Sequence, residues 1–171
     1  SILNKTGDDK LFMNITIIAV GKIKEKFYRD AISEYAKRMS RYGKFDIIEV
    51  ADEQTKENAS DTENEMVKQK EAERILKSIK ADSYVITLEI LGRKTDSVGF
   101  AEKLNKLAIN GNSHIVFVIG GSLGLHESVS KRANEKLSFS DMTFPHQLMR
   151  VILTEQIYRA HRIMNNEPYH K

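Results

Sequence analysis

Hydrophobic residues recur at two different spacings along the chain, and the two spacings predict alternating strands and helices. Short runs rich in β-branched residues, each ending at a glycine or a polar turn, are typical of buried strands. Longer segments with an apolar residue every three or four positions are typical of helices with one inward face. The predicted strands are residues 14–20, 45–50, 84–89, 114–119 and 137–139. The predicted helices are residues 24–42, 66–79, 97–109, 127–134 and 145–165.

The order of these elements predicts the fold class. Strands that alternate with helices build a largely parallel sheet with helices on both faces. Between the second strand and the second helix, residues 52–62 are polar and predict a loop. No internal repeat or domain boundary interrupts the pattern. We therefore expect one α/β domain over residues 13–171.

The first twelve residues do not share this pattern. They begin with Ser1, precede Met13, and show no periodicity that continues into the first strand. We interpret residues 1–12 as a remnant of an expression vector and leave them out of the fold prediction.

Composition narrows the class of protein. Of the 171 residues, 40% are hydrophobic and 30% are charged, which is typical of a soluble globular chain. No apolar run approaches the roughly 20 residues of a membrane helix, and no secretory signal is visible. The chain has no cysteine, which excludes disulfides, thiolate catalysis and sulfur-ligated metals. We expect a cytoplasmic protein without a membrane segment or a metal site.

The charge of the chain is mildly basic. Its formal net charge is +3, and many lysines and arginines gather on the predicted helix 24–42 and near the C-terminus. Such a distribution suits a polyanionic partner but does not identify one.

A glycine-rich turn, residues 120–124 (GGSLG), follows the most apolar predicted strand. In parallel α/β sheets, ligands bind beyond the carboxyl ends of the strands, and glycine lets the backbone approach them closely. A phosphate-binding P-loop is excluded because Leu125 and His126, and no lysine, follow the last glycine. A dinucleotide fingerprint is excluded because the first strand is followed by Gly21 alone. A ligand site and a purely structural turn both stay open.

A second stretch, residues 137–147 (LSFSDMTFPHQ), is short and rich in hydroxyl groups. Its backbone and side chains offer donors and acceptors to a planar, polar ligand. An ordinary connection into the last helix, with Pro145 in the first helical turn, is the alternative.

Several separated motifs together resemble one family. They are IxxVGKxK at residues 17–24, VIGGSxGL at 118–125, LSFSxMTFPHQ at 137–147, Arg150, EQxYR at 155–159 and the closing Tyr-His-Lys at 169–171. In this order, over essentially all of residues 13–171, they resemble the RlmH family, the bacterial SPOUT-class methyltransferases of 23S ribosomal RNA.

The resemblance implies a SPOUT-type α/β knot: a mostly parallel sheet with helices on both faces and a C-terminal trefoil knot. General topology rules disfavour knots, so periodicity alone does not predict one. The resemblance also implies that three loops bind S-adenosylmethionine. The residues in these loops are Leu88, Gly120, Phe139, Ser140, Asp141, Met142, Thr143 and Phe144.

The implied activity is methylation of N3 of a pseudouridine in helix 69 of 23S ribosomal RNA, within the ribosome. Because N3 carries a proton, a base or a group that stabilises the anion would help. The candidates for this role are His146, Glu155, Arg159 and His170. Glu155 and Arg159 are also spaced as an ordinary helical salt bridge.

Contacts to RNA are expected from three residues. Arg150 would bind phosphate, although its side chain could also simply lie along the protein surface with its charge in water. Tyr169 would stack on a base. Lys171 keeps a positive charge but lacks the bidentate fork of arginine.

The family resemblance further implies a homodimer. The last helix supports it, since apolar residues cover more than one of its faces, although burial within its own subunit could explain the same pattern. Three rival functions stay open: a SPOUT methyltransferase with another RNA target, a non-enzymatic RNA-binding module, and a nucleotide enzyme. The last is weak, because both glycine fingerprints fail.

Overall fold

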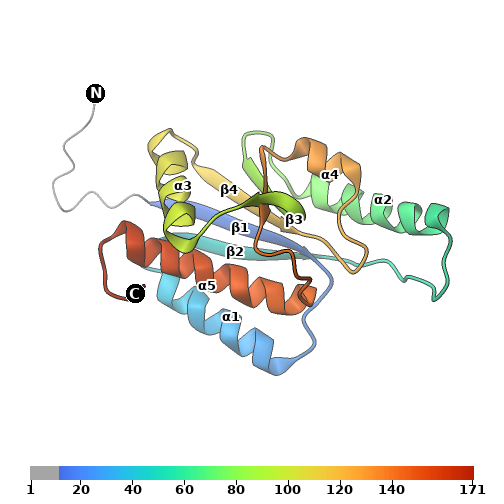
Figure 1. Cartoon of the computed structure of the whole chain (residues 1–171), viewed down its shortest axis with the longest axis horizontal. Helices are drawn as coiled ribbons and strands as arrows, with labels where there is room; N and C mark the ends of the chain where they lie inside the picture. Colours follow the sequence, from blue (N-terminus) through green and yellow to red (C-terminus); the bar gives the residue numbers. More distant parts are fainter. Residues whose placement is uncertain (1–11) are drawn as a thin grey trace.

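The computed structural model describes residues 12–171 (Figure 1). The interpretation of residues 1–12 as a vector remnant therefore falls, except for Phe12, outside the described residues. The strands are β1 (Met13–Val20), β2 (Gly43–Val50), β3 (Tyr84–Lys94), β4 (His114–Ile119) and β5 (Glu135–Ser138). The helices are α1 (Lys26–Met39), α2 (Asp61–Lys77), α3 (Ser97–Ile109), α4 (Glu127–Arg132) and α5 (His146–Met164).

The strands form one sheet in the order β2-β1-β4-β3-β5, and every neighbouring pair is parallel. The predicted parallel α/β sheet is thus confirmed. β1 and β4 lie in the middle and are almost entirely buried, because helices cover both of their faces. This burial explains why both strands contain several consecutive apolar residues, Ile17–Val20 in β1 and Ile115–Ile119 in β4, rather than a strict alternation.

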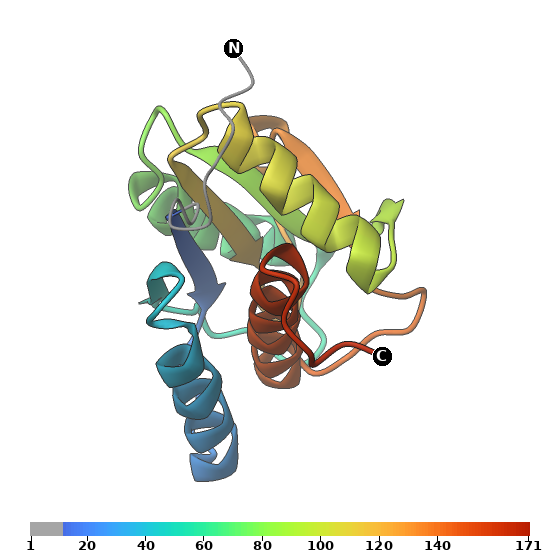
Figure 2. The same cartoon turned by 90° about the vertical axis from the view of Figure 1, so that its left-hand side faces the viewer.

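The helices divide between the two faces of the sheet. One hydrophobic core joins the sheet to α1, α3 and α5, and a second core joins it to α2 and α4. α5 packs against both α1 and α3, and Figure 2 shows it between them. This position explains much of the broad apolar surface of α5, since Leu153, Ile157 and Ala160 are buried within the same chain.

The start of α2 departs from the prediction. The helix begins at Asp61 rather than near residue 66, so the predicted loop is shorter. Ser60 forms a capping box: its hydroxyl accepts a hydrogen bond from the Glu63 amide, and the Glu63 carboxylate accepts from the Ser60 amide. Capping and acidic residues in the first turn stabilise this polar stretch as helix, which apolar spacing does not reveal.

β3 is longer than predicted and is interrupted where it pairs with β5. Leu88 and Arg93 both pair with Leu137, so the four residues between them bulge out of the ladder. Gly92 lies in this bulge, and a Cβ there would stand 2.8 Å from the backbone of Leu137. The missing side chain allows the two backbones to approach closely.

The end of α5 is fixed to the turn after α1 by an aromatic stack. The rings of Tyr42 and His161 lie 4.9 Å apart between centroids and are nearly parallel, with an interplanar angle of 5°. Burial lowers the pKa of His161 to about 4, so the imidazole is neutral near pH 7. Arg41, Arg162 and Tyr42 all donate hydrogen bonds to Glu167 just beyond the helix. These contacts fix the point from which the C-terminal tail departs.

Gly92→Ala is predicted to destabilise the protein by about 3 kcal/mol, because the new methyl group meets backbone that cannot move aside easily. The measurement is the free energy of unfolding in urea. Gly111→Ala is the matched control: Gly111 has φ +86°, but a Cβ there meets nothing within 4 Å. Only backbone strain of about 1 kcal/mol is expected at this position. Equal losses in the two variants would contradict the close approach at Gly92.

Candidate active site

A pocket opens at the carboxyl edge of the sheet, where β3, β4 and β5 end. Seven of the eight residues predicted for the cofactor loops line it: Leu88, Gly120, Phe139, Ser140, Met142, Thr143 and Phe144. Apolar side chains such as Ile119, Leu125 and Met149 cover much of the remaining wall. Parallel pairing brings these segments together, since it places the carboxyl ends of neighbouring strands at the same edge.

The glycine turn forms one wall of the pocket. The amide of Gly124 donates a hydrogen bond to the carbonyl of Gly121 at 3.0 Å, and Gly124 has φ +83°. A Cβ on Gly120 would lie 2.9 Å from the carbonyl carbon of Gly124, so the turn folds tightly back on itself. The glycines are therefore required by the turn and also keep the pocket wall free of side chains.

The loop of residues 139–144 forms the opposite wall. The hydroxyl of Ser140 accepts a hydrogen bond from the Met142 amide at 3.0 Å. The amides of Thr143 and Phe144 donate no hydrogen bond to any residue in the described part of the chain. Asp141 differs from its neighbours: its side chain is 80% exposed, pairs with Lys94 at 2.5 Å, and does not line the pocket.

His146 is the first residue of α5 and also lines the pocket. Its pKa is lowered from the ordinary value, first by burial and then by the nearby positive charge of Arg150. The imidazole is therefore neutral at pH 7 and can accept a proton or a hydrogen bond.

Arg150 departs from the expected contact with RNA. Its side chain is only 1% exposed. The guanidinium donates to the carbonyls of Val20 and Gly21 at 2.8 and 2.9 Å, and to the carboxylate of Glu49 at 2.8 Å. Burial lowers the pKa of Arg150, and the Glu49 carboxylate opposes this effect. Within this chain Arg150 ties α5 to the end of β1, where phosphate cannot reach it.

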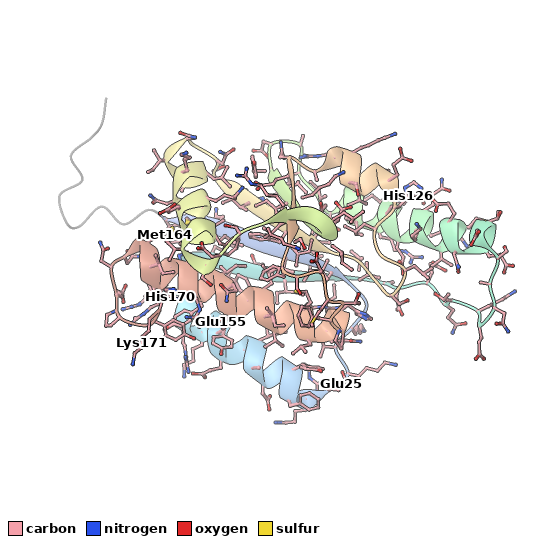
Figure 3. All side chains as sticks on the ribbon, viewed as in Figure 1. Glu25, His126, Glu155, Met164, His170 and Lys171 are labelled. Carbon is pink, nitrogen blue, oxygen red and sulfur yellow. The ribbon has the colours of Figure 1, made fainter. Side chains whose placement is uncertain are left out.

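The other candidate residues gather around the C-terminal tail (Figure 3). One oxygen of Glu155 accepts two hydrogen bonds from Arg159, at 2.7 and 3.0 Å, and one from the Tyr169 hydroxyl at 3.0 Å. Arg159 also lies 3.0 Å from Nδ1 of His170 and over the ring of Tyr169. Burial and the Glu155 carboxylate raise the pKa of Tyr169 to about 12, so the phenol stays protonated as a donor. The predicted helical pair thus holds the tail, while His170 and Lys171 are exposed.

The pocket lies at the start of α5, and the tail cluster lies beside the middle of the same helix. His146 and Glu155 are nine positions apart, which corresponds to about 13 Å along a helix. One chain therefore does not bring His146 together with Glu155, Arg159 and His170.

Glu89 is the one ionisable residue of the pocket that the sequence prediction did not name. Glu89 follows Leu88 in β3 and lines the pocket. The available signal was a carboxylate at the last position of the predicted strand 84–89, at the edge where ligands bind in parallel sheets.

Comparison with known proteins identifies the family of the chain. A family model described as "Predicted SPOUT methyltransferase" matches residues 13–170. The chain belongs to the SPOUT methyltransferase family. It is accordingly a methyltransferase, and the suggestion of a non-enzymatic RNA-binding module is set aside.

Relatives match the chain over most of its length. A protein from Methanococcus maripaludis named "Putative ribosomal RNA large subunit methyltransferase H" is 65% identical over 159 residues, 93% of this chain and all of the relative. The "Ribosomal RNA large subunit methyltransferase H" of Clostridium tetani is 57% identical over the same shares. These matches confirm the predicted family resemblance.

A solved structure supports the fold alone. The structure of a "probable methylase family protein" from Haemophilus influenzae has a TM-score of 0.51 and 17% sequence identity, and the match covers 93% of this chain and 71% of the other. The trefoil knot that the resemblance implies stays a prediction.

Two kinds of feature are absent from the described residues 12–171. None of their helices is both long and apolar enough to cross a membrane. No group of three or more His, Asp or Glu side chains among them is arranged to hold a metal ion.

Glu155→Ala is predicted to release the C-terminal tail, because Tyr169 and Arg159 lose their shared acceptor. The rate at which a carboxypeptidase releases Tyr169 should rise about tenfold, as expected for the loss of one hydrogen bond to a charged group. Glu34→Ala is the matched control, since Glu34 and Arg38 form a similar helical pair at 3.0 Å without contacting the tail. Unchanged release of Tyr169 from the Glu155 variant would contradict the docked tail.

Proposed function

We propose that this chain transfers the methyl group of S-adenosylmethionine to N3 of a pseudouridine in helix 69 of 23S ribosomal RNA. The observation that carries the proposal is the convergence of Leu88, the glycine turn and the 139–144 loop on one pocket. Relatives named ribosomal RNA large subunit methyltransferase H support the class of RNA. The specific nucleotide rests on the resemblance to the RlmH family.

The residues of the pocket fit S-adenosylmethionine. A wall without side chains at Gly120 and Gly124 leaves room for a flat nucleoside close to the backbone. The amides of Thr143 and Phe144, which have no partner in the described chain, offer donors to the edge of a purine. Apolar residues such as Leu88 and Leu125 would cover its faces. Bound there, S-adenosylmethionine supplies an electrophilic methyl group.

The chain's own residues would orient the nucleotide and take up its proton. His146 is the proton acceptor that the pocket favours, because burial keeps its imidazole neutral. Glu155 is less suited, since one of its oxygens already accepts three hydrogen bonds and the other accepts one from Gln156. Glu155 and Arg159 therefore position the tail. His170 and Lys171 at its exposed end would face RNA, with His170 as the second candidate acceptor.

A homodimer would unite the two parts of the site. If the pocket and the tail act on the same nucleotide, the separation along α5 favours a tail from a second subunit. Apolar residues at the pocket are also exposed: Ile90 and Met142 line it and are 47% and 74% exposed, and Leu91, next to Ile90 in β3, is 97% exposed. Such patches mark interfaces. The substrate would then be 23S ribosomal RNA within the ribosome, and the site of action the cytoplasm.

Gly120→Arg is predicted to abolish both cofactor binding and RNA methylation, because a Cβ there meets the backbone of Gly124 at 2.9 Å and so distorts the turn that forms one wall of the pocket. Calorimetry would measure S-adenosylmethionine binding to the purified proteins. Mass spectrometry of ribosomal RNA, from a deletion strain that carries each gene, would locate the methyl group. Wild type should bind the cofactor and restore N3 methylation in helix 69, and the variant should do neither.

Gly111→Arg is the matched control, since Gly111 also has a positive φ but lies in the open turn before β4, at the opposite edge of the sheet. It should bind and methylate like the wild type. Unchanged cofactor affinity in the Gly120 variant would overturn the pocket assignment. Methylation of a different nucleotide would retain the enzyme class but replace the target.

A further inference from the structure

Glu89 is a feature of the pocket that methyl transfer does not explain. It is the only acidic side chain among the residues that line the pocket. It follows Leu88 in β3 and lies within the bulge that interrupts pairing with β5. An anionic group in a largely apolar cavity loses hydration, so it needs a compensating partner.

Two hydroxyl groups hold the Glu89 carboxylate from different elements. Thr87 in β3 donates to Oε2 at 2.6 Å, and Ser130 in α4 donates to Oε1 at 2.8 Å. No lysine, arginine or histidine of residues 12–171 forms an ion pair with Glu89. The carboxylate is therefore fixed in orientation, and no cation among the described residues is paired with it.

The remaining hydrogen-bonding capacity of this carboxylate indicates its ligand. Each oxygen can accept about two hydrogen bonds, and each accepts one from the protein. One further acceptor site is thus left on each oxygen. A pair of neighbouring hydroxyl donors matches these two sites, and the vicinal diol of a ribose is such a pair. An acidic residue at a strand end recognises ribose in the same way in dinucleotide-binding folds.

We propose that Glu89 binds the ribose 2′- and 3′-hydroxyls of S-adenosylmethionine and makes the pocket select ribonucleosides. The proposal rests on the proposed function, since it assumes that the pocket takes this cofactor. Thr87 and Ser130 act as positioning residues that aim the carboxylate. Loss of either ribose hydroxyl leaves part of the carboxylate without a partner, so deoxy analogues bind more weakly.

The test compares S-adenosylhomocysteine with its 2′-deoxy and 3′-deoxy analogues by calorimetry on the full-length protein. The wild type should prefer the ribose form by roughly 10- to 100-fold, the range for a hydrogen bond to a charged group. In Glu89→Gln the affinity for S-adenosylhomocysteine should fall, and the preference should shrink to within about threefold, because the amide is a weaker acceptor. Glu89→Ala, with its thermal unfolding checked, should lose the preference as well.

Glu127→Gln is the matched control, because Glu127 pairs with Lys131 on α4 and does not line the pocket. It should keep both the affinity and the preference. A wild type without a preference, or a preference unchanged in Glu89→Gln, would overturn the role of Glu89 while leaving cofactor binding intact. Weaker binding of S-adenosylmethionine alone, at an unchanged preference, would mean contact with the sulfonium and would also overturn it. A wild type that binds neither compound would overturn the proposed function itself.

Discussion

Parallel pairing of β3 with β4 and with β5 is the constraint on which the site depends. It places the ends of three strands, and the segments that follow two of them, at one edge of the sheet. The glycine turn after β4 and the loop after β5 can then face each other across the end of β3. The bulge beside Gly92 adds to this arrangement, because it moves residues 89–92 out of the ladder and lets Glu89 line the pocket. Backbone pairing therefore brings together the segments whose residues line the pocket.

The helix α5 connects this edge to the rest of the molecule. Near its start, Arg150 binds the carbonyls at the end of β1, and near its end His161 stacks on Tyr42 of the turn after α1. The helix is therefore fixed at both ends. The distance between His146 at the pocket and Glu155 in the tail cluster is set by α5 itself, since both residues belong to this helix. A single chain cannot close this distance while the tail stays bound at Glu155.

Sequence patterns predicted the sheet because its central strands obey a simple physical rule. β1 and β4 are buried on both faces, so apolar residues occupy most of their positions, including consecutive ones. The first turn of α2 escaped prediction because capping by Ser60, rather than apolar spacing, stabilises it. The bulge in β3 escaped because it depends on the backbone of Leu137, which is distant in sequence.

The sequence predicted the parts of the site that are contiguous along the chain, but not the contacts between distant residues. Motifs identified the glycine turn and the 139–144 loop, which are contiguous in sequence. The burial of Arg150 was not predictable, since its partners Val20 and Glu49 lie more than a hundred residues away. Asp141 shares its loop with pocket residues, yet its charge turns it outward to Lys94. Only the tertiary structure distinguishes the residues of this loop that line the pocket from the one that points away from it.

We propose that the pocket of one subunit acts with the tail of another, and mixed dimers test this proposal most directly. One chain carries Gly120→Arg and keeps its tail; the other keeps its pocket and lacks Tyr169, His170 and Lys171. Each defective homodimer should be inactive. Purified mixed dimers contain one complete site, so they should regain about half of the wild-type methylation rate. Mixed dimers as inactive as their parents would contradict the account.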